Sequence, residues 1–287
     1  MSSGKGLRDV GQFLAQYQDS ALVVPNVHPD LEFSLHQLRG EPSVSRCLDT
    51  LGGSPACLIE GYSSPRNGGA VLRFLHAHGV NSPTVEAFDL LDVQCEHPSA
   101  GWPRPSITVH IADACNLAEQ FPTASQDVAF QDFLLNCAPP GDHAAILREA
   151  ARVLRPGGFL IVSFTDWDCL AERPTRTVTE LEQEFLVCWS DHAYHLHTLA
   201  GERAAELLPR LAQSVVAHPS GEWLTWICPD TGHFEFYCSQ ERILGLLEAA
   251  GFELIVHRTS LGTDGNELNC VRHHCVCQRG NAASAAH

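Results

Sequence analysis

Basic residues are scarce in this chain of 287 residues, which carries 34 acidic side chains against 18 lysines and arginines. The formal net charge at pH 7 is -16, so the electrostatic field of the protein repels nucleic-acid phosphates and anionic lipid surfaces. We therefore expect a small-molecule partner, and neither nucleic acid nor a membrane. Whether the protein is a monomer or a homodimer stays open.

Long apolar runs are also missing. None approaches the roughly 20 residues that a helix needs to cross a bilayer, and residues 1–12 lack the apolar segment of a secretory signal. We expect a cytoplasmic protein. Hydrophobic residues make up 44% of the chain and no internal repeat is present, which excludes a disordered chain and predicts a globular one.

The cysteines of the chain do not form the repeated pairs of a disulfide-rich domain. Most of the 12 cysteines stand singly in apolar stretches, so we interpret most of them as buried thiols and expect no disulfide framework. The one cluster is His273, His274, Cys275 and Cys277. Alternate residues of a strand face opposite ways, so His274 points away from the other three. No second pair of ligands at zinc spacing lies nearby. We expect no metal site.

The stretch from Cys57 to Asp89 reads as half of a nucleotide-binding fold. A short apolar strand at 57–59 is followed by a glycine-bearing loop, by a helix that Gly79 ends, and by a second strand at 85–88. Asp89 then lies just past a strand's carboxyl end, about 20 residues beyond the loop, where a ribose-binding acid is expected.

Strands and helices continue to alternate downstream. Strands are predicted at 107–111, 126–135 and 159–164, with a helix over 142–154 that begins at the capping residue Asp142. This alternation predicts parallel strands with right-handed crossovers, and so a doubly wound α/β fold.

Two segments flank this core. Residues 1–50 show an interrupted helical pattern and predict an N-terminal helical cap, in which Tyr17 is placed to lean over a ligand or to join the core. Residues 51–287 would form the α/β domain, with 170–235 inserted as a lid. Thr177 to Val216 is predicted to be mostly helical, followed by strands at 223–227 and 234–237 that form a hairpin or a sheet edge. The end of the chain predicts a helix from Gln240 and then two antiparallel strands.

Three runs carry a family likeness: IADACNL, QDVAFQDFLLN and HAAILREAARVLRPGGFLIVSF. Together they resemble class I S-adenosylmethionine-dependent methyltransferases over roughly Leu58 to Phe164, and the likeness resumes at ERILGLLEAAGFELI. The resemblance implies a mostly parallel seven-stranded sheet and S-adenosylmethionine as the cofactor.

The resemblance also implies a set of cofactor-binding residues. Asp89 would hold the ribose hydroxyls and Asp113 the adenine amino group, since carboxylate oxygens accept hydrogen bonds from both. Asn136, at the end of the fourth strand, would lie near the methionine part or the reacting atom. The further residues that match the family pattern are Glu60 and Gly61 in the first loop, Leu90 against the adenine, and Ala114.

The first loop departs from the family pattern. EGYSSPRNGG is longer than the usual loop and lacks its alternating glycines. We expect Tyr62, Ser64 and Arg66 to contact the cofactor in their place. The guanidinium of Arg66 suits a carboxylate in a bidentate way, and the alternative for it is a solvent-exposed arginine.

The leading functional hypothesis is methyl transfer to a small molecule under the lid. A helix carrying HAYHLH would place His192 and His195 on one face, and these two residues, Tyr194, Tyr237, Tyr17 and Asn136 are the catalytic candidates. The alternative for the lid residues is a polar, partly buried surface.

Two other functions stay open. Some proteins that look like methyltransferases use S-adenosylmethionine as the substrate itself and close it to azetidine-2-carboxylate and methylthioadenosine. The altered loop and the aromatic lid would suit that reaction. A catalytically silent S-adenosylmethionine-binding protein is the third possibility. The acceptor is not identified by the sequence.

Overall fold

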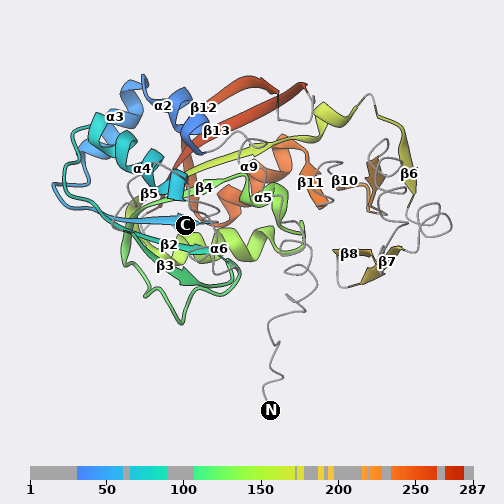
Figure 1. Ribbon diagram of the computed structural model, residues 1–287, viewed down its shortest axis with the longest axis horizontal. Coiled ribbons are helices and arrows are strands. Elements are labelled where there is room, and N and C mark those ends of the chain that lie inside the picture. Colours follow the sequence, from blue (N-terminus) through green and yellow to red (C-terminus); the bar gives the residue numbers. More distant parts are fainter. Residues whose placement is uncertain are drawn as a thin grey trace, which may run out of the picture.

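The structure, a computed structural model, describes residues 31–60, 65–89, 107–171, 173–177, 187–190, 193–196, 215–218, 220–227, 234–263 and 269–280. A seven-stranded sheet with the order β12-β13-β5-β4-β1-β2-β3 lies at its centre (Figure 1). Its strands are β1 (Ala56–Glu60), β2 (Thr84–Asp89), β3 (Thr108–Ile111), β4 (Gln126–Asp132), β5 (Leu154–Thr165), β12 (Phe252–Thr263) and β13 (Asn269–Arg279). The first five pair in parallel and the last two are antiparallel. The predicted doubly wound, mostly parallel sheet is confirmed.

Helices cover both faces of this sheet. On one face α2 (Leu31–Leu38), α3 (Pro42–Asp49) and α4 (Pro65–Ala77) form a core with Ile59 and Phe130. On the other face α5 (Leu134–Cys137), α6 (His143–Val153) and α9 (Gln240–Ala249) pack against Leu58 and Ala129. No helix among the described residues is long and apolar enough to cross a membrane.

The two long helices on that second face begin differently. Asp142 occupies the N-cap position of α6, but its side chain makes no capping hydrogen bond. Ser239 does cap α9, because its hydroxyl accepts a bond from the backbone N–H of Arg242 at 3.2 Å. The apolar stripe of α6, with Ile146, Leu147 and Ala150 buried, accounts for its packing on the sheet.

The RPGG run forms the first part of β5 and not a break before it. Gly157 has a φ of +80°, which favours glycine. A Cβ on Gly158 would lie 2.9 Å from the backbone oxygen of Asp127, so a larger residue would push β5 away from β4. The run therefore sets the close approach of two central strands.

The inserted segment differs from its prediction. Its described residues include β6 (Thr175–Thr177), β9 (Val215–Ala217), β10 (Trp223–Ile227) and β11 (Phe234–Cys238), which form a second sheet in the order β11-β10-β9-β6, and the hairpin of β7 (Val187–Ser190) and β8 (Ala193–Leu196). The expectation of a helical lid over 177–216 is wrong for these residues, whereas the predicted hairpin of β10 and β11 is confirmed. The reason is that short aromatic and β-branched runs such as VCWS fit a strand as well as a helix by periodicity alone.

Candidate active site

Acidic residues stand at the carboxyl ends of all five parallel strands. Glu60, Asp89 and Asp132 are the last residues of β1, β2 and β4. Asp113 follows β3 by two positions, and Asp166 follows β5 directly. Open α/β sheets bind their ligands outside this edge. The carboxyl edge of the sheet is therefore the candidate active site.

Glu60 is a buried carboxyl group at the centre of this edge. It is 1% exposed and accepts a hydrogen bond from the side-chain amide of Gln131, its register partner on β4. Burial raises the pKa of Glu60 to about 8, against the lowering effect of the Gln131 bond, and the charge of Glu149 raises it further. Glu60 is consequently a neutral acid at pH 7.

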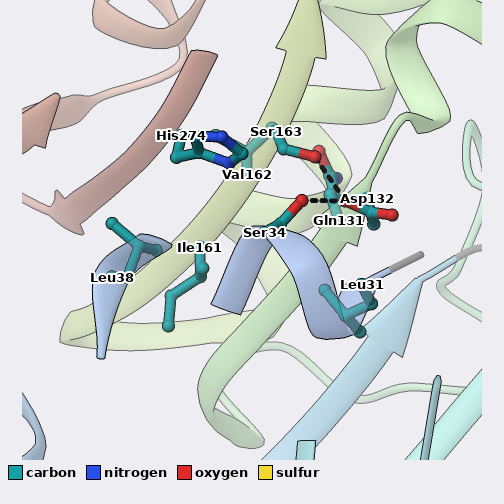
Figure 2. A pocket seen from close by; sticks show the side chains of 9 residues that line it. All are labelled: Leu31, Ser34, Leu38, Gln131, Asp132, Ile161, Val162, Ser163 and His274. Atoms are coloured by element: carbon teal, nitrogen blue, oxygen red, sulfur yellow. Dashed lines mark hydrogen bonds between the residues drawn. The ribbon is translucent and has the colours of Figure 1, made fainter. Parts of the chain in front are cut away.

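Asp132 collects three hydrogen-bond donors on a single oxygen. Its Oδ1 accepts bonds from the hydroxyls of Ser34 on α2, at 2.7 Å, and of Ser163 on β5. Figure 2 shows both bonds beside a closely packed pocket that His274, Leu31 and Leu38 help to line. The third donor is the Nη2 of Arg272 on β13, at 2.5 Å. Three strands and one helix meet at this carboxylate.

Phe133, which follows Asp132, adopts a strained backbone conformation. Its φ is +59°, in the left-handed region that a bulky residue rarely occupies. This turn ends β4 and starts α5, and it brings the Phe133 ring to 5.4 Å from the guanidinium carbon of Arg272. Strained residues of this kind are concentrated at functional sites.

Asn136, predicted at the cofactor or the reacting atom, is 2% exposed and bridges three backbone groups. Its Nδ2 donates to the carbonyl oxygens of Thr165, at 2.9 Å, and Phe236, at 3.0 Å. Its Oδ1 accepts from the N–H of Thr165 at 3.0 Å. These bonds tie α5 to β5 and β11, so the amide has a structural task, and its role toward a ligand stays a prediction.

Cys137 lies near charged side chains from several strands of the edge. Burial raises the pKa of this thiol far above its usual range, and the nearby charges of Glu235, Asp132 and Asp89 raise it further, while Arg272 acts in the opposite direction. The thiol is inert as a nucleophile in such a setting. Its surroundings show that β2, β4, β11 and β13 direct charged side chains to the same place.

The two acids predicted to hold adenosine lie on neighbouring strands and reach solvent. Asp89 is partly exposed and Asp113 is exposed. Asp113 Oδ1 accepts a bond of 2.8 Å from the N–H of Cys115, which fixes the turn after β3, and Ala114 is buried beside it. Because β2 and β3 pair in parallel, both acids stand at the same edge.

Tyr237 on β11 is fully buried, and its hydroxyl donates to Glu235 two residues earlier, at 2.5 Å. Glu235 is 2% exposed. It provides the hydrogen-bond acceptor that a buried phenol requires. The structure thus pairs the predicted Tyr237 with an acid that the sequence patterns do not single out.

Asp166 begins a chain of side-chain contacts that leads away from the edge. Its Oδ2 lies 3.0 Å from His273 Nε2, and His273 Nδ1 lies 2.9 Å from His257 Nε2. His273 also stacks on Phe164, while His274 points to the opposite face and bonds Ser260 at 2.7 Å, as predicted for alternate residues of a strand. No group of three metal-ligating side chains gathers anywhere in the described part of the chain.

Several predicted residues lie outside the described residues, namely Tyr17, Gly61, Tyr62, Ser64, Leu90 and His192. The backbone of Arg66 belongs to α4, and Tyr194 and His195 belong to β8; their side chains lie outside the description. His192 and His195 were expected on one helix face. That placement is wrong for His195, because β8 is a strand.

Sequence reasoning missed Gln131, Asp132, Glu235 and Arg272. Asp132 lies inside the run predicted as a strand to residue 135, and the earlier end of β4 is what puts it at the edge. Arg272 stands on the last strand next to His273. An arginine in the middle of a strand predicted to belong to the sheet was the available signal, since such a charge is rarely buried without a partner.

Part of the chain matches a known protein family. Residues 67–162 match the family model of a methyltransferase domain. This part of the chain is a methyltransferase domain. It spans α4 to β5 and includes Asp89, Asp113 and Asp132 at the edge. No curated protein sequence matches the chain.

Several solved structures are similar to this chain. An S-adenosylmethionine-dependent methyltransferase from Methanosarcina mazei is 14% identical with a TM-score of 0.51, over 81% of this chain and 95% of that one. Burkholderia thailandensis 1,6-didemethyltoxoflavin-N1-methyltransferase, solved with 1,6-didemethyltoxoflavin and S-adenosylhomocysteine, is 15% identical with a TM-score of 0.49, over 94% and 87% of the two chains. A Mesorhizobium loti methyltransferase is 18% identical with a TM-score of 0.47, over 84% and 100%. The likeness to the Methanosarcina mazei protein confirms the class I fold.

Proposed function

We propose that the chain is an S-adenosylmethionine-dependent enzyme that transfers a methyl group to a small molecule. The observation that carries this proposal is the row of acidic side chains at the ends of β1, β2 and β4, at the ligand edge of a methyltransferase domain. S-adenosylmethionine is the cofactor that the domain match supports, and it supplies a methyl group activated by a positive sulfonium.

The residues present fit this cofactor. Asp89 and Asp113 offer solvent-reachable carboxylate oxygens on adjacent strands, as a ribose diol and an adenine amino group require. The acidic surroundings of Cys137 favour a cationic ligand over an anionic one. Asp89 would hold the ribose, Asp113 the adenine, and the loop with Tyr62, Ser64 and Arg66 the methionine part.

The chain's own contribution is to bind, orient and exclude water. Methyl transfer from a sulfonium is an in-line displacement, in which proximity and alignment supply most of the rate. A neutral acceptor must also lose a proton when it is methylated. The buried, hydrogen-bonded pair of Glu235 and Tyr237 is the proposed group that takes up this proton. His192, Tyr194 and His195 remain proposed candidates, and Tyr17 would close over the ligand from the N-terminal segment.

The test is to incubate the purified protein with S-adenosylmethionine, with and without a small-molecule extract, and to identify the sulfur-containing product. S-adenosylhomocysteine that forms only with the extract supports methyl transfer. Methylthioadenosine formed without an acceptor would replace the proposal by the cyclisation alternative. Binding without any turnover would leave a silent S-adenosylmethionine-binding protein.

A further inference from the structure

Arg272 is a buried guanidinium, and some of its hydrogen-bond donors have no acceptor among the described residues. The residue is 2% exposed, and its Nη2 donates to Asp132 at 2.5 Å and to Ser163 at 3.1 Å. A guanidinium carries five N–H donors. The buried Nε and Nη1 of Arg272 donate to no acceptor within the described part of the chain. Buried charged donors are rarely left unsatisfied, because each loses its water without a replacement.

The position of Arg272 places these donors at the ligand edge. On β13 it is the register partner of Thr165, the last residue of β5. Its guanidinium lies over the ring of Phe133, in the strained turn between β4 and α5, and its charge acts on Cys137 together with that of Asp89. Arg272 therefore stands on the side of the sheet edge where cofactor and acceptor would meet.

The surrounding contacts hold the guanidinium in one orientation. Asp132 Oδ1 receives Ser34 and Ser163 in addition to Arg272, so its carboxylate is fixed from three elements. A charged group whose orientation is set by packing and by its own partners is ready to receive a ligand without further ordering.

We propose that the Nε and Nη1 groups of Arg272 bind a carboxylate of the ligand held at this edge. The inference rests on the proposed function. A singly charged carboxylate suits the site better than a phosphate, because Asp89, Asp132 and Glu235 already contribute negative charge around Cys137. The carboxylate has two possible sources, the amino acid part of S-adenosylmethionine and the acceptor.

Binding of two adenosyl ligands separates these sources. S-adenosylhomocysteine carries the carboxylate, and methylthioadenosine lacks it. Calorimetry measures the affinity of each ligand for the wild-type chain and for Arg272→Met. The unfolding midpoint of each ligand complex is then measured with added sodium acetate, and sodium chloride of equal ionic strength is the control. If Arg272 binds the carboxylate of the cofactor, Arg272→Met lowers the affinity for S-adenosylhomocysteine about tenfold or more and leaves the affinity for methylthioadenosine unchanged. Acetate then stabilises only the wild-type complex with methylthioadenosine, in which the carboxylate position is empty.

For a carboxylate of the acceptor, both adenosyl ligands keep their affinity. Acetate then raises the unfolding midpoint of the wild-type S-adenosylhomocysteine complex in a saturable way, and Arg272→Met abolishes that shift. Either pattern supports the inference.

Two controls keep the test sharp. Arg258→Met removes an arginine of the neighbouring β12 that pairs with Glu41 at the surface, and it should change none of these measurements. Arg272→Lys keeps a positive charge beside Asp132 but not the guanidinium N–H pattern, so it reports binding even if Arg272→Met folds poorly.

Unchanged ligand and acetate binding in folded Arg272→Met or Arg272→Lys overturns the inference and leaves Arg272 as an ion-pair partner of Asp132. Equal losses for both adenosyl ligands overturn it as well, because they indicate a general disturbance of the edge. A wild-type chain that binds neither adenosyl ligand refutes the proposed function instead.

Discussion

Ser34 and Asp132 are joined by a hydrogen bond of 2.7 Å across 98 positions of the chain. Ser34 belongs to α2 of the N-terminal segment, and Asp132 ends the central strand β4. Ser34 is 2% exposed. The bond therefore fastens a helix of the cap to the carboxylate that also orients Arg272.

Replacing Ser34 by alanine should lower the free energy of unfolding by about 1 kcal/mol, the usual net value of a buried hydrogen bond. Denaturant titration measures the change. Ser43→Ala, which removes a hydroxyl that accepts a bond from exposed Arg46, should change stability by less than about 0.5 kcal/mol. Equal effects at the two positions would show that the Ser34 bond contributes nothing specific.

Glu60→Gln should alter how stability depends on pH. The folded pKa of Glu60 is raised to about 8 from 4.5, so between these values the folded state holds a proton that the unfolded state has released. Wild-type stability therefore falls as pH rises through this window, by up to about 1.4 kcal/mol per unit from this group. The glutamine variant should lack that part of the slope.

The control for this experiment is Glu253→Gln, at an exposed position of β12, which reports the loss of one acidic charge without burial. Unfolding is followed at several pH values from 5 to 8. Parallel stability curves for wild type and Glu60→Gln would show that Glu60 titrates normally in the fold.

Asp89→Ala should weaken S-adenosylmethionine by about 1.5 to 3 kcal/mol, the range for losing hydrogen bonds to a charged acceptor. Methylthioadenosine should lose as much, since it has the same ribose. Calorimetry provides both affinities. A folded variant with wild-type affinity would remove Asp89 from the cofactor site.

Arg66→Ala should weaken S-adenosylmethionine by more than about 1.5 kcal/mol and leave methylthioadenosine bound as well as before. The reason is the predicted contact of its guanidinium with the methionine carboxylate, so Arg66→Lys should also bind less tightly. Equal losses for both ligands would indicate a general disturbance of the first loop, and no loss would return Arg66 to the surface.

Asn136→Ala should destabilise the fold by more than about 3 kcal/mol, because backbone groups of Thr165 and Phe236 would lose their partner inside the protein. Asn136→Asp keeps the acceptor for the Thr165 N–H but sets a buried carboxylate oxygen against the carbonyl oxygens of Thr165 and Phe236, so a loss at least as large as that of the alanine variant is expected. If thermal unfolding shows no change in the alanine variant while S-adenosylmethionine binding falls, the side chain serves the ligand and not the fold.

Much of the fold follows from local patterns in the sequence. The alternation of buried strands with amphipathic helices between Cys57 and Phe164 is enough to predict parallel pairing, because crossover connections permit few other topologies. The antiparallel pair of β12 and β13 follows in the same way from a turn-rich connection. The secondary structure of the inserted segment was harder to predict. Its described strands are only three to five residues long, and a hydrophobic pattern this short fits a helix and a strand equally well.

The residues of the candidate site also differ in whether local sequence patterns could predict their position. The positions of Asp89 and Asp113 at the edge were predictable, because each lies within two residues of the end of a recognisable strand and a strand end is a local property. The contact of Arg272 with Asp132 was not, because 140 positions separate the two residues and only the placement of β13 beside β5 brings them together. Local patterns thus predicted where β2 and β3 end, while tertiary packing decided which side chains became buried and which polar groups they contact.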